Sequence, residues 1–331
     1  MRPRTFTFAV TALTCAAAIS FTTAARCDAQ TPAANTPSPL SRPAGEPGVG
    51  QQQFDTDDQA AAALVAATKA HDHDVLNQMF GPSITEFVSG DKVEDEKAFD
   101  HFVTKAAEHL ELEKKDGNTS LIDIGADKWP FPIPLTRLAN GKWFFDTEAG
   151  KNEILARRIG ANELETIKVC HGYVDAQRQY ASEDRDGSGV LKYAQHFIST
   201  HGKDGLYWES APGQPPSPIS QFIAQANMEG YTPQSKAASA PQPYHGYVYR
   251  ILTQQGSAAP GGEYNYIING NMIAGFALVA CPTEYGTSGV MTFIINQQGK
   301  LYQKDLGPKT SEIVQTMNEF NPDSSWTPVT D

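Results

Sequence analysis

Apolar residues recur at helical spacing in three stretches of the first half of the chain. Thr56 or Asp57 can cap the first stretch, because short polar side chains accept hydrogen bonds from the first free backbone amides of a helix. The second stretch covers residues 74–80 and the third covers residues 94–109. The pattern therefore predicts three helices before the first strand.

Strand-like runs follow these helices. Residues 110–114 and 120–124 flank an Asp-Gly-Asn turn, and residues 133–138 and 143–145 flank an Asn-Gly turn. Helices followed by a meander of strands predict an α+β domain over residues 54–147, with the helices packed on a curved sheet.

The second half repeats this order with a longer helix. Asn162 and Glu165 have the spacing of a capping box, so a helix is expected over about residues 163–182. A shorter helix, five strand-like runs between residues 247 and 304 and a closing helix over residues 310–320 come next. We expect a second α+β domain over residues 148–331, joined to the first near residues 147–162.

The first 29 residues have the pattern of a secretory signal peptide. Arg2 and Arg4 precede an uncharged apolar run that ends near Phe21, and small residues follow. Cleavage is expected before Gln30, with a site before Arg26 as the alternative and a retained membrane anchor as the competing interpretation. Residues 30–53 are rich in Pro, Ala, Thr and Gly and predict a disordered linker. The pattern indicates a periplasmic or secreted protein with no membrane span after cleavage.

Charge argues against one class of partner, and cysteine content limits the possible disulfides. The chain has 26 basic and 38 acidic residues, a net charge of −12, which becomes about −14 when the signal peptide leaves. Such a surface repels phosphate backbones, so nucleic acid is not an expected partner. Only Cys170 and Cys281 remain after cleavage, and they can form a disulfide or stay as buried thiols.

Five segments resemble domain of unknown function family 2950. They are GKWFFDTEAG (141–150), YVDAQRQY (173–180), DGLYW (204–208), YHGYVYRILT (244–253) and EYGTSGVMTFI (284–294). The resemblance covers about residues 54–331 and implies an exported bacterial protein, without implying an activity. Residues 54–147 also resemble small cone-shaped folds of the nuclear-transport-factor-2 type. Residues 163–306 resemble the globular part of type IV pilins and pseudopilins, although the long helix lacks their apolar N-terminal half.

One loop has part of the pattern of a calcium-binding site. Asp184, Asp186 and Ser188 occupy positions one, three and five of such a loop, and Val190 can offer its carbonyl at position seven. Position twelve is Gln195 instead of the usual bidentate Glu, and position nine is a lysine. Calcium is therefore the one cofactor that the sequence suggests, and the alternative is a turn whose Asp and Gly residues serve backbone geometry.

Aromatic residues suggest a ligand pocket in the first domain. Phe80, Trp129, Phe131 and Trp143 can line an apolar cavity of a cone-shaped fold and bind a small apolar ligand, although core packing explains them equally well.

Several histidines and carboxylates can supply acid–base groups, but no spacing joins them and no catalytic motif is present. We therefore expect a non-catalytic binding or protein-interaction module of the cell envelope. The alternatives are an envelope hydrolase that uses residues such as His245 and Glu284, and an accessory component of pilus-like or secretion machinery. Histidine and carboxylate groups within hydrogen-bond reach in one cleft would favour the hydrolase.

Overall fold

The computed structural model describes residues 44–87, 91–229, 231 and 243–330, so the predicted signal peptide lies outside the described residues. The fold belongs to the α+β class, as the sequence predicts, and its main sheets are antiparallel. No helix in the described part of the chain combines the length and the apolar character needed to cross a membrane.

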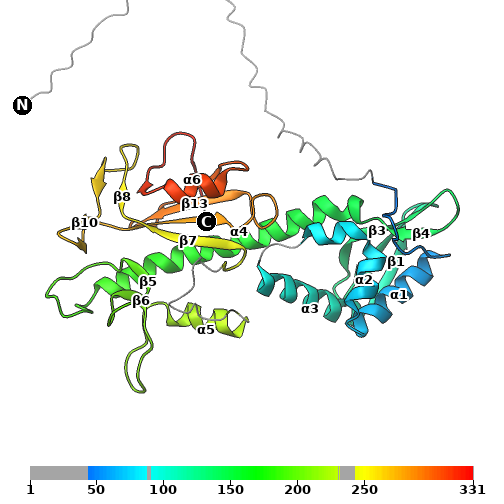
Figure 1. Ribbon diagram of the computed structural model, residues 1–331, viewed down its shortest axis with the longest axis horizontal. Helices are drawn as coiled ribbons and strands as arrows, with labels where there is room; N and C mark the ends of the chain where they lie inside the picture. The colour runs from blue at the N-terminus through cyan, green and yellow to red at the C-terminus, as the bar shows by residue number, and fades with distance from the viewer. Residues whose placement is uncertain (1–43, 88–90, 230, 232–242, 331) are drawn as a thin grey trace, which may run out of the picture. The chain divides into compact units, whose positions relative to one another are not determined.

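The first lobe places helices against a four-stranded antiparallel sheet (Figure 1). Both predicted hairpins are present, with strand order β1-β2-β3-β4. Its core is formed by Leu64, Met79, Ile122 and Phe145, all of them fully buried. The elements are α1 (Asp57–Lys69), α2 (His73–Phe80), η1 (Pro82–Phe87), α3 (Lys92–Glu108), β1 (Leu110–Lys114), β2 (Thr119–Ile124), β3 (Trp129–Arg137) and β4 (Trp143–Phe145).

The segment before α1 corrects the linker prediction for residues 44–53. Gln51 is buried, and its amide donates to the carbonyl oxygens of Met79 (2.9 Å) and Phe145 (2.8 Å). The Gly48 amide donates to Gln51 Oε1 at 2.7 Å. The low apolar content suggested disorder, but a polar side chain that satisfies three buried backbone groups anchors this segment instead.

A single helix, α4 (Thr147–Ala181), is 35 residues long and contributes to both lobes. Asp146 caps it by accepting from the Ala149 amide at 3.1 Å. The prediction of a helix start near residue 163 is therefore wrong, and the expected join at 147–162 is helical. Asn162, assigned to a cap, lies inside the helix and donates to the Ser288 carbonyl at 2.8 Å.

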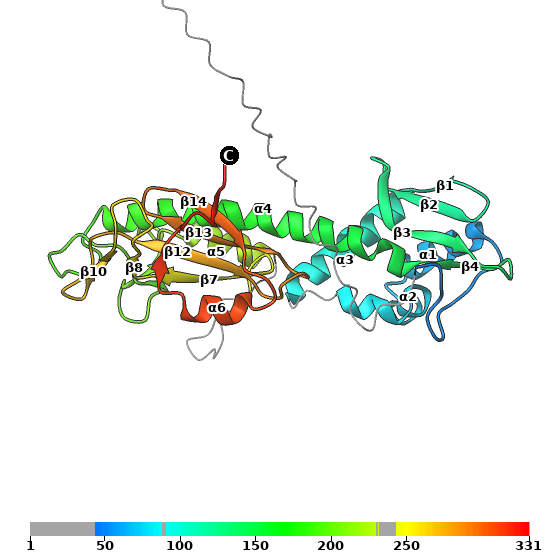
Figure 2. The same cartoon turned by 90° about the horizontal axis from the view of Figure 1, so that it is seen from above.

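The second lobe is a five-stranded antiparallel sheet between two helices (Figure 2). On β7 (Tyr247–Leu252), Tyr249 reaches Thr166 of α4, while the next residue, Arg250, donates to the Val314 carbonyl of α6 (Thr310–Thr316). Because successive strand residues point to opposite faces, α4 and α6 cover opposite faces of the sheet. β12 is buried along its whole length as a result. The sheet order is β16-β14-β13-β12-β7.

Besides the C-terminal part of α4, this lobe contains the five strands of the sheet, two further helices and several short strands. They are β5 (His196–Ile198), β6 (Gly205–Tyr207), α5 (Ser220–Met228), β7 (Tyr247–Leu252), β8 (Gln254–Gln255), β9 (Tyr264–Asn265), β10 (Ile267–Ile268), β11 (Asn271–Met272), β12 (Ala277–Pro282), β13 (Met291–Asn296), β14 (Leu301–Asp305), α6 (Thr310–Thr316), β15 (Glu319–Phe320) and β16 (Thr327–Pro328).

Candidate functional site

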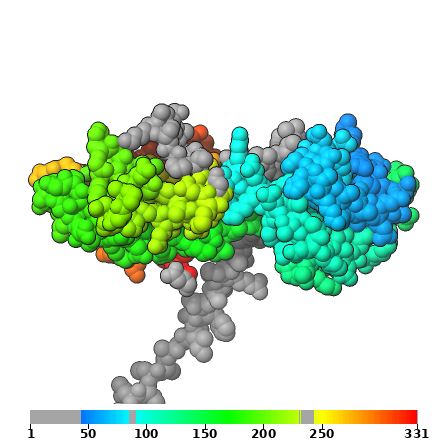
Figure 3. Space-filling model, turned by 90° about the horizontal axis from the view of Figure 1, so that it is seen from below, coloured from blue at the N-terminus to red at the C-terminus, as the bar shows by residue number. Residues whose placement is uncertain are grey.

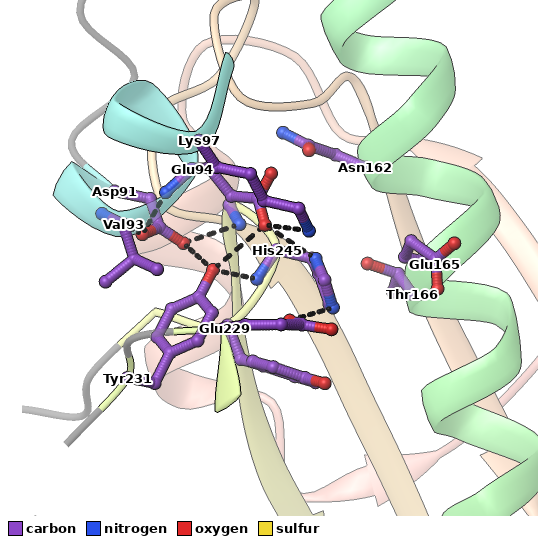
Figure 4. Close-up of polar contacts among 12 residues, drawn as sticks. Asp91, Val93, Glu94, Lys97, Asn162, Glu165, Thr166, Glu229, Tyr231 and His245 are labelled. Atoms are coloured by element: carbon purple, nitrogen blue, oxygen red, sulfur yellow. Dashed lines mark hydrogen bonds and ion pairs between the residues drawn. The ribbon is translucent and has the colours of Figure 1, made fainter. Parts of the chain in front are cut away.

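Three ionisable side chains from distant parts of the chain meet beside α4 (Figure 4). Glu94 comes from the first turn of α3, Glu229 ends α5, and His245 precedes β7. His245 Nδ1 lies 2.9 Å from Glu94 Oε1, and Nε2 lies 3.4 Å from Glu229 Oε2. Within the described residues, this is the one group of three or more His, Cys, Asp or Glu side chains whose ligand atoms lie within 4.8 Å of one another. We call these three residues the acid–histidine cluster.

The backbone at His245 is held in an uncommon conformation. Its φ is +51° and that of Gly246 is +71°, the left-handed values that a tight hairpin turn of the primed type requires at both central positions. Tyr244 and Tyr247 close this turn through two mutual backbone hydrogen bonds. The turn type accounts for this left-handed backbone, which His71, Lys128 and Asn269 also adopt elsewhere in the described residues.

A second layer of hydrogen bonds fixes this turn. Asp91, which also caps α3, accepts from the Tyr231 hydroxyl at 2.8 Å and from the Gly246 amide at 3.0 Å. The Tyr231 oxygen in turn accepts from the His245 amide at 3.1 Å. These buried hydrogen bonds hold the backbone at His245 and thereby fix the direction of its imidazole.

The electrostatics of the cluster favour the ionised form of Glu94. Burial raises the pKa of Glu94, but the hydrogen bond from His245 and the charges of Lys97 and His245 outweigh it, so the pKa of Glu94 lies below its ordinary value. Burial raises the pKa of Tyr231, and the neighbouring carboxylates of Asp91 and Glu94 raise it further. Tyr231 therefore stays protonated and donates to the carboxylates.

An acidic hollow of about 360 Å³ opens beside the cluster. Figure 3 shows the two helices that border it, α3 in cyan and α5 in yellow-green, side by side on the surface. Met228 on its rim is 83% exposed. The hollow carries three carboxylates against one ammonium, and it is lined by Val93, Glu96, Lys97, Asp100, Met228 and Glu229.

The predicted calcium loop is a tight turn held by hydrogen bonds to Asp184 and by an ion pair between Asp186 and Lys192. Asp184 accepts from the amides of Ser188 (3.2 Å) and Gly189 (2.8 Å). The Lys192 ammonium lies 2.6 Å from Asp186 Oδ2, and this hydrogen bond is the largest cause that lowers the pKa of Asp186 to about 2. A calcium ion at this loop has to displace that ammonium.

The other two residues predicted to bind calcium are Val190 and Gln195. Gln195 donates to the Gly270 carbonyl at 2.9 Å, and Val190 follows the Ser188–Gly189 turn as a half-buried residue. Calcium binding here remains a prediction.

The residues predicted to line an apolar pocket lie in and around the first core. Phe80, Phe131 and Trp143 are buried there, with the rings of Phe80 and Phe131 6.0 Å apart. Trp129 packs at the edge of this core, beneath the guanidinium of Arg157 at 4.6 Å. The structure thus brings these aromatic residues into one region, and a ligand among them remains a prediction.

Sequence reasoning selected one of the three cluster residues. It considered His245 but paired it with Glu284. Glu284 lies in the turn between β12 and β13, where its backbone amide donates to Ser288 Oγ. The sequence pattern placed Glu94 at the start of a predicted helix without a functional role. No motif or spacing pointed to Glu229. Glu94 and His245 lie 151 residues apart, so no local spacing can reveal their contact.

The two cysteines among the described residues, Cys170 on α4 and Cys281 on β12, are both buried free thiols. Burial raises the pKa of Cys281 to about 11 and that of Cys170 further. Both therefore act as small apolar core residues rather than as reactive groups.

The fold and the cluster define an α+β protein whose two cores share one helix and meet at a buried histidine. The family model described as a protein of unknown function, DUF2950, matches residues 51–329, and the chain belongs to this family. Comparison with curated proteins and with solved structures gives no match.

Proposed function

We propose that this protein is an exported, non-catalytic binding protein of the cell envelope that holds a cationic segment of a partner protein in its acidic hollow. The observation that carries the proposal is the composition of this hollow. Glu96, Asp100 and Glu229 face it against Lys97 alone, in a chain whose net charge is already −12. Opposite charge steers a basic partner to such a surface and fixes its register.

The rim of the hollow supports a contact with a macromolecule. Met228 is almost fully exposed, although a large apolar side chain on a surface is more stable when it is covered. Methionine is flexible and polarizable and suits surfaces that adapt to a partner. The apolar stems of lysine or arginine residues would pack on Met228 while their charged ends reach the carboxylates.

Site-specific photo-crosslinking in the native envelope tests this proposal. A crosslinker at Met228 should capture a basic partner, whereas one at Leu191, an exposed apolar residue of the Asp184 loop, should not. The double charge reversal E96K/D100K and high salt should each abolish the Met228 product. Equal crosslinking at both positions, or a product insensitive to charge reversal, would contradict the proposal.

The contact between His245 and Glu94 favours a second candidate, an envelope hydrolase. A carboxylate that orients an imidazole is the usual arrangement of a general base. His245 is only 5% exposed, however, which leaves little room for a substrate. A screen with model esters, amides and phosphate esters should find no turnover, and turnover that E94Q abolishes would establish the hydrolase instead.

A further inference from the structure

We propose that the acid–histidine cluster is a divalent transition-metal site, with His245 Nε2 and Glu229 as direct ligands and Glu94 as the residue that positions the imidazole. This inference concerns a different ligand from the cationic partner proposed above and stands without it. Imidazole and carboxylate are ligands that zinc and its neighbours in the first transition row accept.

The separation of the two ligand atoms matches metal geometry better than a hydrogen bond. His245 Nε2 and Glu229 Oε2 lie 3.4 Å apart, and Glu229 Oε2 is a buried atom with no hydrogen-bond partner. Two ligands of a tetrahedral zinc ion, with bonds of about 2.0–2.2 Å, lie about 3.4 Å from each other. An ion between these two atoms would coordinate the carboxylate oxygen that the protein leaves without a hydrogen bond.

The atoms of Glu229 and His245 that would not bind the metal, Oε1 and Nδ1, each have a partner in the protein. The other oxygen of Glu229 accepts from the side-chain nitrogen Nε2 of Gln225 at 2.9 Å, one helical turn earlier. The other nitrogen of His245 lies 2.9 Å from Glu94 Oε1, so a proton on Nδ1 leaves the Nε2 lone pair free for a metal. A carboxylate that holds a metal-binding histidine in this way is a recurrent outer layer of zinc sites.

The charge of the site has the sign that a dication would balance. Asp91, Glu94 and Glu229 contribute three carboxylates, and Lys97, which is half exposed, lies 3.5 Å from Glu94. The ligands come from α5 and from the turn before β7, while Glu94 comes from α3. Metal binding should therefore hold α5 against the turn before β7, and it should raise the thermal stability of the protein.

Metal titration of the mature protein, stripped with a chelator, tests this inference. Zinc should bind at one ion per chain by calorimetry, and cobalt in its place should give the visible absorption of tetrahedral nitrogen and oxygen coordination. E229Q should weaken zinc binding by at least about tenfold, and E94Q by about 10–100-fold. E284Q, the same change at a glutamate outside the cluster, should leave the affinity unchanged.

H245N provides the complementary variant, because asparagine tolerates the left-handed backbone that position 245 requires. H245N should lose zinc binding, whereas H201N, a change at a 93% exposed histidine, should not. If H245N does not fold, E229Q still decides the question, since Glu229 has an ordinary backbone conformation (φ −79°).

Absence of saturable zinc or cobalt binding at millimolar concentrations, or equal affinities for the wild type and E229Q, would overturn the metal site. The cluster would then be a buried ion-pair clamp between the lobes. That result would leave the Met228 crosslinking untouched, so the metal site and the partner-binding role fail separately.

Discussion

Tyr231 shows how a single residue organises the candidate site. Its hydroxyl donates to Asp91 and accepts from the amide of His245, thereby joining α3 to the turn before β7. These groups are buried, so a lost partner leaves a polar atom without water to replace it. The Tyr285 hydroxyl also donates to an aspartate, Asp305, but that pair is exposed to solvent.

The variant Y231F should therefore destabilise the protein by about 1–3 kcal/mol, because Asp91 and the His245 amide both lose a buried partner. Y285F removes the same kind of hydrogen bond at the surface and should cost about 0.5 kcal/mol or less. Urea unfolding measures both changes through the midpoint concentration. Equal losses for the two variants would show that the Tyr231 network contributes nothing special to stability.

Asp186 gives a pH dependence with a definite sign. Its folded pKa of about 2 lies below its ordinary value of 3.8, chiefly because Lys192 donates to it. The stabilisation is therefore fully present above about pH 4 and is lost as the pH falls toward 2. The stability difference between wild type and D186N should close over this range, and the same substitution in a K192Q background should show a weaker pH dependence, because only the hydrogen bonds from Ser188 then lower the pKa of Asp186. A pH-independent difference in the wild-type background would refute the assignment.

The same lysine controls the predicted calcium site. We expect weak affinity, with a dissociation constant on the order of 10⁻⁴ to 10⁻³ M, because Gln195 replaces a charged bidentate ligand and Lys192 occupies Asp186. K192Q should therefore enlarge the rise in melting temperature that millimolar calcium produces relative to chelator. The gain should vanish in D184A, whose melting temperature without calcium also falls because two backbone amides lose their acceptor. Unchanged melting temperatures in both buffers, for wild type and K192Q alike, would identify the loop as a turn only.

At the scale of elements, the packing of α5 on α4 depends on one glycine. A Cβ atom built at Gly172 would lie 2.0 Å from Cζ of Phe222, so the Phe222 ring packs directly on the α4 backbone. Gly160, in the same helix, has no atom within 4 Å of the corresponding position. Both glycines therefore lie in the same helix, but an added Cβ atom would clash with a neighbour at Gly172 and would meet none at Gly160.

G172A should destabilise the protein by about 1–3 kcal/mol, because the added methyl group pushes α5 away from α4. It should also lower the affinity for any ligand that binds Glu229, because Glu229 is the C-cap residue of α5. G160A should instead stabilise the protein by up to about 1 kcal/mol, since alanine favours a helix over glycine and meets no neighbour. Thermal unfolding of both variants decides this, and a loss of stability in G160A as large as that in G172A would refute the packing argument.

Local patterns predicted most elements because their signals are contained in a few residues. The turn at residues 116–118 and the helix stop at Gly81 are examples, and the observed hairpin and α2 confirm them. The start of α4 was missed because Asn162 and Glu165 imitate a cap, while the true cap, Asp146, follows a strand directly. The acid–histidine cluster was missed because its members meet only through tertiary packing, which sequence spacing does not encode.

At the scale of the whole molecule, two separate hydrophobic cores share one helix. The N-terminal part of α4 packs Ile154 against the first core, and the C-terminal part contributes Tyr173, Val174 and Tyr180 to the second. Unfolding of either core would fray the helix that the other core needs. The contacts of His245 with Glu94 add a second connection between the same lobes. Both connections favour cooperative unfolding of the described chain.

The variant G160P tests this coupling at the middle of α4. Proline removes a helix hydrogen bond and clashes with the preceding turn, at a cost of about 3 kcal/mol or more, without touching either core. Scanning calorimetry should show one transition for the wild type and for G160A, and two for G160P, because a broken helix lets each core unfold on its own. A single G160P transition at a lower temperature would mean that the lobes are coupled through the junction at His245 rather than through the helix. The double variant G160P/E94Q would then be expected to separate the two transitions, since it removes both connections at once.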